Sequence, residues 1–424
     1  MTAGRGLAPV RTELPNGVRL LVQPSRVTPA VTLHLSLEAG TVCDPDGLGG
    51  VAHFLSKVID RGAGDWTGDE IGESLDGRGA SLVVSVNRHA LTLVTTCLAE
   101  DFAALVRLLA VVVMRPTLPE TEVALRRGEV LTLIRQDQDN PAVVAVERLA
   151  AELYGRAHPY GRPSRGTAES VRGIGRDALA AFHRARVGPS TLTLAVVGDV
   201  EPEAASDVVA AAFGDWDAPV SPGSVLQPVP PATGRRAVVV PMMNKAQADI
   251  AYGFVTIART DPAFHAAWVM NNILGQYSMG GRLGDSIRER QGMAYYAMTQ
   301  FDPAVLPSPL VVRAGVDPAN VERTVASIDA EIAAFLAGGP TEKELAESKQ
   351  YLIGSLPRQL ETHAAIARFL QTVEFFGLGL DYDRRLPGLL RAVTRDEVMA
   401  SARALLDPAR ATVVVAGPYA GGLA

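Results

Sequence analysis

The sequence has few cysteines and no long apolar run. The only two cysteines among 424 residues, Cys43 and Cys97, exclude a framework of disulfide bonds, and this scarcity is typical of a reducing, cytoplasmic compartment. The longest apolar run, near residues 105–114, is interrupted by Arg107 and is far shorter than the roughly 20 residues that cross a bilayer. Residues 1–10 lack the apolar core of a signal peptide. We therefore expect a cytoplasmic protein without a membrane partner.

An excess of basic charge is also missing. The chain carries 40 Lys and Arg residues against 46 Asp and Glu residues, which gives a net charge of -6. Because binding to nucleic acid depends on clustered positive charge, we expect no nucleic-acid partner. The length exceeds what one compact core accommodates and suits two domains of about 200 residues each.

An internal repeat supports a two-domain organisation. Residues 176–198 and 395–417 align without a gap, and both copies begin with Arg-Asp, contain a proline and end with glycine. Each copy predicts a helix, a turn that contains the proline and a strand rich in β-branched residues. We therefore expect two domains related by duplication, at residues 1–216 and 235–424. A Pro/Gly/Ser-rich linker is expected between them at 217–234.

Strand and helix patterns follow the same order in both halves. The sequence predicts strands at residues 17–23, 30–38, within 82–97, 237–240, 247–255 and after 292. It predicts helices at residues 100–114, 120–139 and 264–277, in addition to the segment that contains His53. This order of elements indicates an α+β fold in each half.

Residues 50–57 (GVAHFLSK) keep the spacing of a zinc-binding helix but lack most of its chemistry. In the motif H-x-x-E-H, two histidines one turn apart bind zinc and the glutamate activates the metal-bound water. Here His53 is the only histidine, Ser56 stands at the base position and Lys57 at the second ligand position. Because an ammonium group has no lone pair to offer a metal ion, this segment predicts no metal site.

The sequence around His53 resembles the insulinase/pitrilysin family of inverted-zincin peptidases, in particular its mitochondrial-processing-peptidase-like branch. Residues 50–63 (GVAHFLSKVIDRGA) follow the family pattern G-x-A-H-F-L-E-H-M-x-x-x-G-T apart from Ser56 and Lys57. The family's third zinc ligand is a glutamate on a second helix, and the matching positions here are Thr132 and Leu133. The resemblance therefore implies a degenerate zinc site and no cofactor in this chain.

A second matching segment lies in the C-terminal half. Residues 281–296 (GRLGDSIRERQGMAYY) are similar to the family pattern R-L-x-x-x-x-R-x-x-x-G-x-A-Y. In that family an arginine and a tyrosine of this segment reach into the active site, and the matching residues are Arg288 and Tyr295. A guanidinium and a phenol aimed at a developing oxyanion would stabilise the transition state of peptide hydrolysis. We expect Arg288 in the last turn of a helix that ends at Gly292, and Tyr295 on the strand that follows.

The resemblance also implies an architecture and different roles for two paired subunits. It implies two homologous α/β-sandwich halves of the processing-peptidase type that face one another across a cleft. In the processing-peptidase branch, one subunit binds zinc and a paralogous subunit without zinc ligands completes the chamber. We therefore expect a noncatalytic subunit that is inactive alone. It would form a heterodimer with a zinc-containing H-x-x-E-H paralogue and would lend Arg288 and Tyr295 to the cleavage of short or unfolded peptides. For the isolated chain, a homodimer is an alternative assembly.

The sequence leaves several alternatives. His53 can be a packed histidine of an amphipathic helix, Arg288 part of an exposed charged turn, and Tyr295 an ordinary strand residue. The loop at 158–167 (HPYGRPSRGT) also resembles a family stretch, and we assign it no chemistry. The whole chain can be a peptide-binding or structural module without a hydrolytic role. It can also be a divergent metalloenzyme with a rebuilt site, although the other histidines lack helical pairing: His34, His89, His158, His183, His265 and His363.

Overall fold

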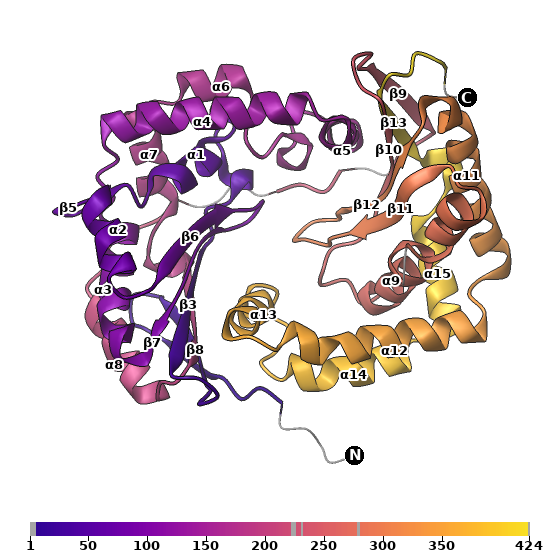
Figure 1. Cartoon of the computed structure of the whole chain (residues 1–424). Helices are drawn as coiled ribbons and strands as arrows, with labels where there is room; N and C mark the ends of the chain where they lie inside the picture. Colours follow the sequence, from indigo (N-terminus) through magenta and orange to yellow (C-terminus); the bar gives the residue numbers. More distant parts are fainter. Residues whose placement is uncertain (1–5, 222–225, 230–231, 278–279, 423–424) are drawn as a thin grey trace. The chain divides into compact units, whose positions relative to one another are not determined.

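The computed structural model forms two compact units, each assembled from both halves of the sequence (Figure 1). It describes residues 6–221, 226–229, 232–277 and 280–422. The first unit contains Met1–Ile134, Pro163–Ser224 and Pro357–Arg384. The second unit contains Arg135–Arg162, Val225–Leu356 and Arg385–Ala424. Within the predicted linker at 217–234, residues 222–225 and 230–231 lie outside the described residues.

A six-stranded sheet lies in the first unit, with the strand order β1-β2-β8-β3-β7-β6. β2 and β8 are parallel, and the other neighbouring strands are antiparallel. The strands are β1 Val10–Glu13, β2 Arg19–Pro24, β3 Ala30–Leu37, β6 Ser81–Val86, β7 Leu91–Leu98 and β8 Leu192–Gly198. A separate hairpin contains β4 Gly62–Ala63 and β5 Trp66–Thr67.

A five-stranded sheet lies in the second unit, with the strand order β11-β12-β10-β13-β9. β9 and β13 are parallel, and the other neighbouring strands are antiparallel. The strands are β9 Arg236–Pro241, β10 Ala248–Val255, β11 Ala294–Phe301, β12 Pro309–Val316 and β13 Thr412–Gly417. Read from β9 to β11, this order and these directions repeat those from β2 to β6, so the predicted α+β class with two related halves is confirmed.

Helices connect the strands in both units. In the N-terminal half they are α1 Val51–Val58, α2 Gly68–Asp76, α3 Phe102–Met114, α4 Glu120–Gln138, α5 Pro141–Tyr154, α6 Ala168–Gly173, α7 Arg176–Arg186 and α8 Pro202–Phe213. In the C-terminal half they are α9 Phe264–Asn271, α10 Gly281–Leu283, α11 Val321–Gly338, α12 Glu342–Gln359, α13 His363–Phe375, α14 Tyr382–Ala392 and α15 Arg395–Leu405. Two π-helical segments, η5 Asn272–Gln276 and η6 Gly284–Arg290, directly follow α9 and α10. Among the helices that the structure describes, none has both the length and the apolar character of a membrane span.

The repeated sequence unit has the same structure in both copies. In the first copy α7 is followed by a short 3-10 turn at the proline and by β8, and in the second α15 is followed by such a turn and by β13. The arginine that opens each copy also has the same role. Arg176 donates to the carbonyl oxygens of Thr117 and Leu118, and Arg395 donates to those of Gly338 and Pro340. Both arginines thus bind backbone at or just after the end of an earlier helix of their own unit.

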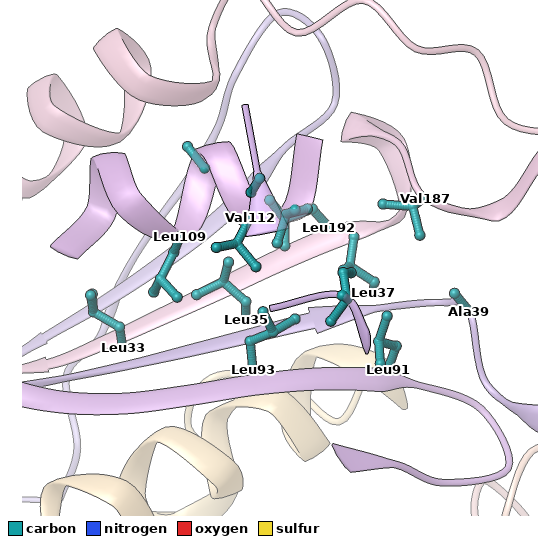
Figure 2. Packing of buried hydrophobic residues seen from close by; sticks show 14 of the residues in the cluster. Leu33, Leu35, Leu37, Ala39, Leu91, Leu93, Leu109, Val112, Val187 and Leu192 are labelled. Atoms are coloured by element: carbon teal, nitrogen blue, oxygen red, sulfur yellow. The ribbon is translucent and has the colours of Figure 1, made fainter. Parts of the chain in front are cut away.

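The core of the first unit lies between its sheet and the helices on one face of it (Figure 2). Leu33, Leu35 and Leu37 alternate along β3, because successive side chains of a strand point to opposite faces. All three are fully buried, and they belong to the same apolar cluster as Leu109 and Val112 of α3. The intervening residues of β3 face the other side of the sheet.

Each unit takes one covering helix from the opposite half of the sequence. Helix α5 contacts β10 and β13 of the second unit, and helix α13 contacts β3 and β8 of the first unit. In the two strand orders, β3 corresponds to β10 and β8 corresponds to β13. The two helices therefore cover equivalent strands. The contiguous domains at 1–216 and 235–424 stay a prediction. That prediction did not include the exchange of helices between the two halves.

Helix α13 is joined to its sheet by a buried amide. The Gln371 side chain lies in the apolar environment of this interface and donates to the carbonyl oxygens of His34, at 2.6 Å, and Thr193, at 2.9 Å. These acceptors lie on the neighbouring strands β3 and β8. One side chain therefore connects the exchanged helix to two strands of the sheet.

Replacing Gln371 by alanine should lower the free energy of unfolding by about 1–3 kcal/mol, because two buried carbonyl acceptors lose their donor. Urea unfolding followed by circular dichroism measures the change. The matched control is Gln350→Ala on α12, which changes an exposed glutamine and should stay within about 0.5 kcal/mol of the parent. Equal losses in both variants would show that the amide does not hold α13 in place.

Candidate functional site

The helix that carries the degenerate motif begins at a tightly packed glycine. Gly50 is the N-cap of α1 and has φ of 92°, a left-handed conformation that favours glycine. A Cβ at this position would lie 2.3 Å from the carbonyl oxygen of Arg165. The Asp44 carboxylate accepts hydrogen bonds from the backbone N–H groups of Gly50, at 2.6 Å, and Ala52, at 3.0 Å. The start of α1 is therefore fixed by a carboxylate cap and by the loop that contains Arg165.

Helix α1 packs its apolar face in the core and keeps His53 and Lys57 at its edge. Phe54, Leu55 and Val58 are fully buried in the main cluster of the first unit. His53 and Lys57 are half-buried, one helical turn apart. Ser56 is buried, and its hydroxyl donates to the carbonyl oxygen of His53 at 2.7 Å. This hydroxyl is therefore engaged with the backbone of its own helix.

The His53 ring lies in an environment that disfavours its charged form. The pKa of His53 is lowered to about 4, mainly by burial and in smaller part by the positive charges of Lys57 and Arg165. Its Nε2 atom is buried and has no hydrogen-bond partner among the residues that the structure describes. The imidazole is thus neutral at pH 7, with positive neighbours.

The second predicted ligand position lies on α4 and offers no carboxylate. Thr132 donates its hydroxyl to the carbonyl oxygen of Gly128, one turn earlier, at 2.9 Å. Leu133 is a half-buried aliphatic side chain without a donor atom. Among the described residues no group of three or more His, Cys, Asp or Glu side chains is placed to hold a metal ion. One imidazole beside an ammonium does not fit zinc, which takes at least three protein ligands.

Several of the other histidines bond to the protein itself. The Nε2 atoms of three histidines lie at hydrogen-bond distance from another group: His158 at 2.9 Å from Gln227 O, His183 at 2.7 Å from Val113 O, and His363 at 3.0 Å from Ser25 Oγ. His265 packs against the ring of Phe264. The structure therefore does not bring the histidines of the rebuilt-site alternative together in its described part.

Arg288 lies in the last turn of a helical segment, as predicted, but this segment is a π-helix. Residues Gly284–Arg290 form η6 directly after α10. π-helical segments are rare and occur often at functional sites. The Arg288 Nε atom lies 3.2 Å from a carboxylate oxygen of Glu289, and both side chains are partly exposed. Such an exposed ion pair is weak, so it leaves the guanidinium accessible to another partner.

Tyr295 lies at a bulge of the edge strand β11. Ala294 pairs with Val316 and Tyr296 pairs with Gly315, so Tyr295 is the additional residue between the two pairs. A bulge of this kind turns a side chain away from its regular direction. The Tyr295 side chain is 84% exposed, which contradicts the alternative of ordinary strand packing.

The neighbouring residue, Tyr296, is held in place by a side chain from another strand of the same sheet. The Tyr296 hydroxyl donates to Asp249 on β10, and the Gln247 amide also donates to that carboxylate, at 3.3 Å. Burial raises the pKa of the Tyr296 phenol, and the bond to Asp249 adds to this effect. A Cβ on Gly315 would lie 2.6 Å from the Tyr296 ring, so a larger residue there would displace this ring. Tyr296 is therefore structural, and its fixed position supports the bulge that exposes Tyr295.

Sequence reasoning missed three features of these two sites. It gave no role to the loop around Arg165, although the resemblance of residues 158–167 to a family stretch was a signal. It also missed the bulge at Tyr295 and the π-helical form of residues 284–290. The paired tyrosines and Gly292, with φ of 61°, were the available sequence signals for an irregular strand start.

Comparison with known proteins defines the class of this chain. Residues 19–168 match the model of the insulinase family, peptidase family M16, and residues 173–352 match the model of the peptidase M16 inactive domain. Together the two models cover most of the sequence. The chain belongs to peptidase family M16.

Its relatives include proteins named as zinc proteases. An uncharacterized zinc protease of Streptomyces coelicolor is 26% identical over 96% of this chain and 89% of that protein. Another, of Mycobacterium leprae, is 27% identical over 99% of this chain and 94% of that protein. A protein of Arabidopsis thaliana named as a mitochondrial-processing peptidase subunit beta is 24% identical over 66% of this chain and 53% of that protein.

Solved structures share the fold over nearly the whole chain. A peptidase M16 inactive domain from Pseudomonas fluorescens is 25% identical, with a TM-score of 0.91 over 99% of this chain and all of that one. The periplasmic protease PqqL of Escherichia coli is 17% identical, with a TM-score of 0.82 over 99% of this chain and 46% of that one. The second likeness concerns the fold alone.

Restoring the helix motif alone should not restore a catalytic site. The double variant Ser56→Glu and Lys57→His would supply two histidines and a base, but Thr132 and Leu133 still leave zinc without its third protein ligand. We expect no stoichiometric zinc after dialysis and no peptidase activity, measured by atomic absorption and by cleavage of a fluorogenic peptide. The double variant is compared with triple variants that also carry Leu133→Glu or Thr132→Glu. Full zinc loading of the double variant without either glutamate would contradict the prediction.

Three histidines with a lowered pKa should make the first unit sensitive to acid. Burial lowers the pKa of His34, His53 and His89 to about 4, and nearby cations act in the same direction. Because an unfolded histidine titrates near pH 6.5, the unfolded chain binds protons between about pH 6.5 and 4 that the folded chain does not bind. The free energy of unfolding should therefore fall as the pH falls through this window.

The variant His53→Gln tests the contribution of one ring. It should reduce the proton uptake on unfolding by about one proton within the window, so its stability should fall less steeply with pH than that of the parent. Urea unfolding at several pH values between 7 and 4 gives both slopes. Parallel slopes would show that His53 titrates alike in the folded and unfolded chain.

Proposed function

We propose that this protein is the noncatalytic subunit of a two-component zinc peptidase of family M16. The observation that carries the proposal is the combination of a zinc motif reduced to His53 with an accessible Arg288 and Tyr295 in the second unit. The match of residues 173–352 to an inactive-domain model supports a noncatalytic role. A paralogous catalytic subunit with an intact H-x-x-E-H motif and a distal glutamate would supply the zinc site.

The residues at the degenerate site argue against hydrolysis by this chain alone. Lys57 cannot bind zinc, and Ser56 uses its hydroxyl on the carbonyl oxygen of His53 instead of on a water molecule. Thr132 likewise donates within its own helix. The name zinc protease, which several relatives carry, therefore does not transfer to this chain on the basis of its own residues.

The role of Arg288 and Tyr295 would be electrostatic. Attack on a peptide carbonyl places negative charge on its oxygen, and donors aimed at that oxygen lower the barrier. The Tyr295 phenol would donate one hydrogen bond, and the Arg288 guanidinium would add a charge-assisted one. The exposure of Tyr295 and the weak surface pair of Arg288 leave both groups accessible to a substrate bound by the partner.

The substrate would be a short or unfolded peptide, by analogy with the chambered peptidases of this family. Extended peptides can add to the edge of a sheet through main-chain hydrogen bonds. The strand β6 lies at the edge of the first sheet, and its Val83 side chain is exposed. We assign this edge to peptide binding within the same proposal.

A reducing compartment also belongs to the proposal. Cys43 and Cys97 are free thiols, and burial raises the pKa of both, that of Cys97 to about 11. Thiols with a raised pKa react poorly, and free thiols persist where disulfides are reduced. These properties favour the cytoplasm.

Two other functions differ in their tests. A structural or peptide-binding module of the same fold would form complexes without increasing peptide cleavage in any of them. A divergent metalloenzyme would bind metal stoichiometrically by itself, and the described residues supply no donor set for it. Co-expression with a catalytic M16 paralogue, followed by size analysis and a peptide-cleavage assay, distinguishes the three.

Within the mixed enzyme, Tyr295→Phe and Arg288→Ala should each lower kcat by about one to three orders of magnitude, because each removes a donor to the oxyanion. Steady-state kinetics on the purified complex measures the effect, and the zinc content of the complex should stay unchanged.

Matched substitutions separate this effect from general damage. Tyr351→Phe changes another exposed tyrosine of the second unit, and Arg290→Ala changes another exposed arginine of η6. Both should leave kcat near the parent value. Wild-type turnover in the Tyr295 and Arg288 variants would remove these residues from the mechanism.

A further inference from the structure

A hollow that is open to solvent lies beside helix α12 in the second unit. Its volume is about 320 Å³, which is in the lower part of the range of small-ligand pockets. Its lining consists of two aromatic rings, a methyl group, a carboxylate and an amide, from Tyr277, Tyr351, Ala346, Glu347 and Gln350. The residues from α12 recur at helical spacing, so they share one side of this helix.

The two tyrosine rings form a corner of this hollow. The ring centroids of Tyr277 and Tyr351 lie 5.6 Å apart, and the ring planes meet at 83°. Tyr351 is 42% exposed and Tyr277 is half-buried, so both rings stay accessible to solvent. The face of an aromatic ring carries a negative potential that attracts cations. Two rings at a right angle can therefore attract one cation from two directions.

One residue, Asn272, connects the two elements that carry these tyrosines. Tyr277 follows the π-helical segment η5 directly, and its backbone N–H donates to the carbonyl oxygen of Asn272 at 2.7 Å. On α12, the buried Ser348 hydroxyl lies three residues before Tyr351 and bonds to Asn272 Oδ1 at 2.8 Å. The corner is thus held together before any ligand binds. Its position at the end of a π-helix is also typical of functional sites.

The charge of the lining selects the kind of ligand. Glu347 is the charged residue of the lining, and its charge is negative. Its ion-pair partner is Lys343 at 3.9 Å, and the two side chains are 42% and 82% exposed. Such an exposed pair is weak and screened by salt, so the carboxylate can accept another cation. An anion would be repelled by Glu347, and an apolar group would desolvate this carboxylate without compensation.

We propose that this hollow binds a guanidinium group such as the side chain of an arginine. A guanidinium is planar and weakly hydrated, so it would stack on the face of one tyrosine and donate to the Glu347 carboxylate at the same time. The group can come from a peptide or from a free guanidinium compound. This binding needs no catalytic partner, so it stands or falls independently of the proposed subunit role.

Nuclear magnetic resonance of the isolated full chain with isotope-labelled tyrosine tests the site at pH 7 and constant ionic strength. The probes are methylguanidinium, acetyl-arginine amide and acetyl-citrulline amide, in which the guanidinium is replaced by a neutral group of the same shape. We expect the two cations, but not the citrulline compound, to shift the ring signals of Tyr277 and Tyr351 in a saturable way. Tighter binding of the arginine amide than of methylguanidinium identifies a peptide side chain as the ligand, and equal binding identifies free guanidinium compounds.

Substitutions in the lining complete the test. Glu347→Gln removes the charge and Tyr351→Leu removes a ring face, so each should weaken cation binding by about threefold or more, measured on the Tyr277 signal. Tyr351→Phe keeps the ring and should bind like the parent. Glu342→Gln is the matched control, because it removes an exposed carboxylate of α12 outside the lining and should not change binding. Circular dichroism confirms that each variant is folded. Equal binding of the citrulline and arginine amides would overturn the site, and so would unchanged binding in both the Glu347→Gln and Tyr351→Leu variants.

Discussion

The two units depend on one packing constraint, which is that each sheet is covered by a helix encoded in the opposite half of the sequence. Helix α13 covers β3 and β8, and helix α5 covers β10 and β13. β3 illustrates the need for this cover, because its residues are buried on both faces of the sheet. Without α13 one of these faces would expose apolar and polar groups that now have partners, including the carbonyl oxygens bound by Gln371.

Packing also explains why helix α1 is retained although most residues of the zinc motif are missing. The apolar residues of α1 belong to the core, and its start is fixed by Asp44 and by the Arg165 loop. These contacts preserve the helix whatever occupies its edge. His53 and Lys57 lie half-buried at that edge, so they can change with little effect on the core. The scaffold and the chemistry of this helix are therefore separable.

Local sequence patterns predicted much of the fold, and non-local packing accounts for most of what they missed. The repeat at residues 176–198 and 395–417 predicted the same helix, turn and strand twice, and the structure has them at those positions. The exchange of α5 and α13 was not predictable, because nothing in a helix's own periodicity specifies which sheet it covers. The bulge at Tyr295 depends on Asp249 and Gly315, which lie on other strands, so its local sequence could not specify it. The candidate site residues were named from the motif, while Arg165 joins them only through folding.

The exchanged helices have a consequence for synthesis on the ribosome. When the first half of the chain has emerged, α5 has no sheet to cover, because β10 and β13 are still to be translated. The first sheet in turn waits for α13, which is made more than three hundred residues after β3 begins. Contacts so distant in sequence close slowly and leave apolar surface exposed meanwhile. A nascent chain of this protein therefore cannot complete either unit until nearly all of it has been made, which gives chaperones a long interval in which to bind it.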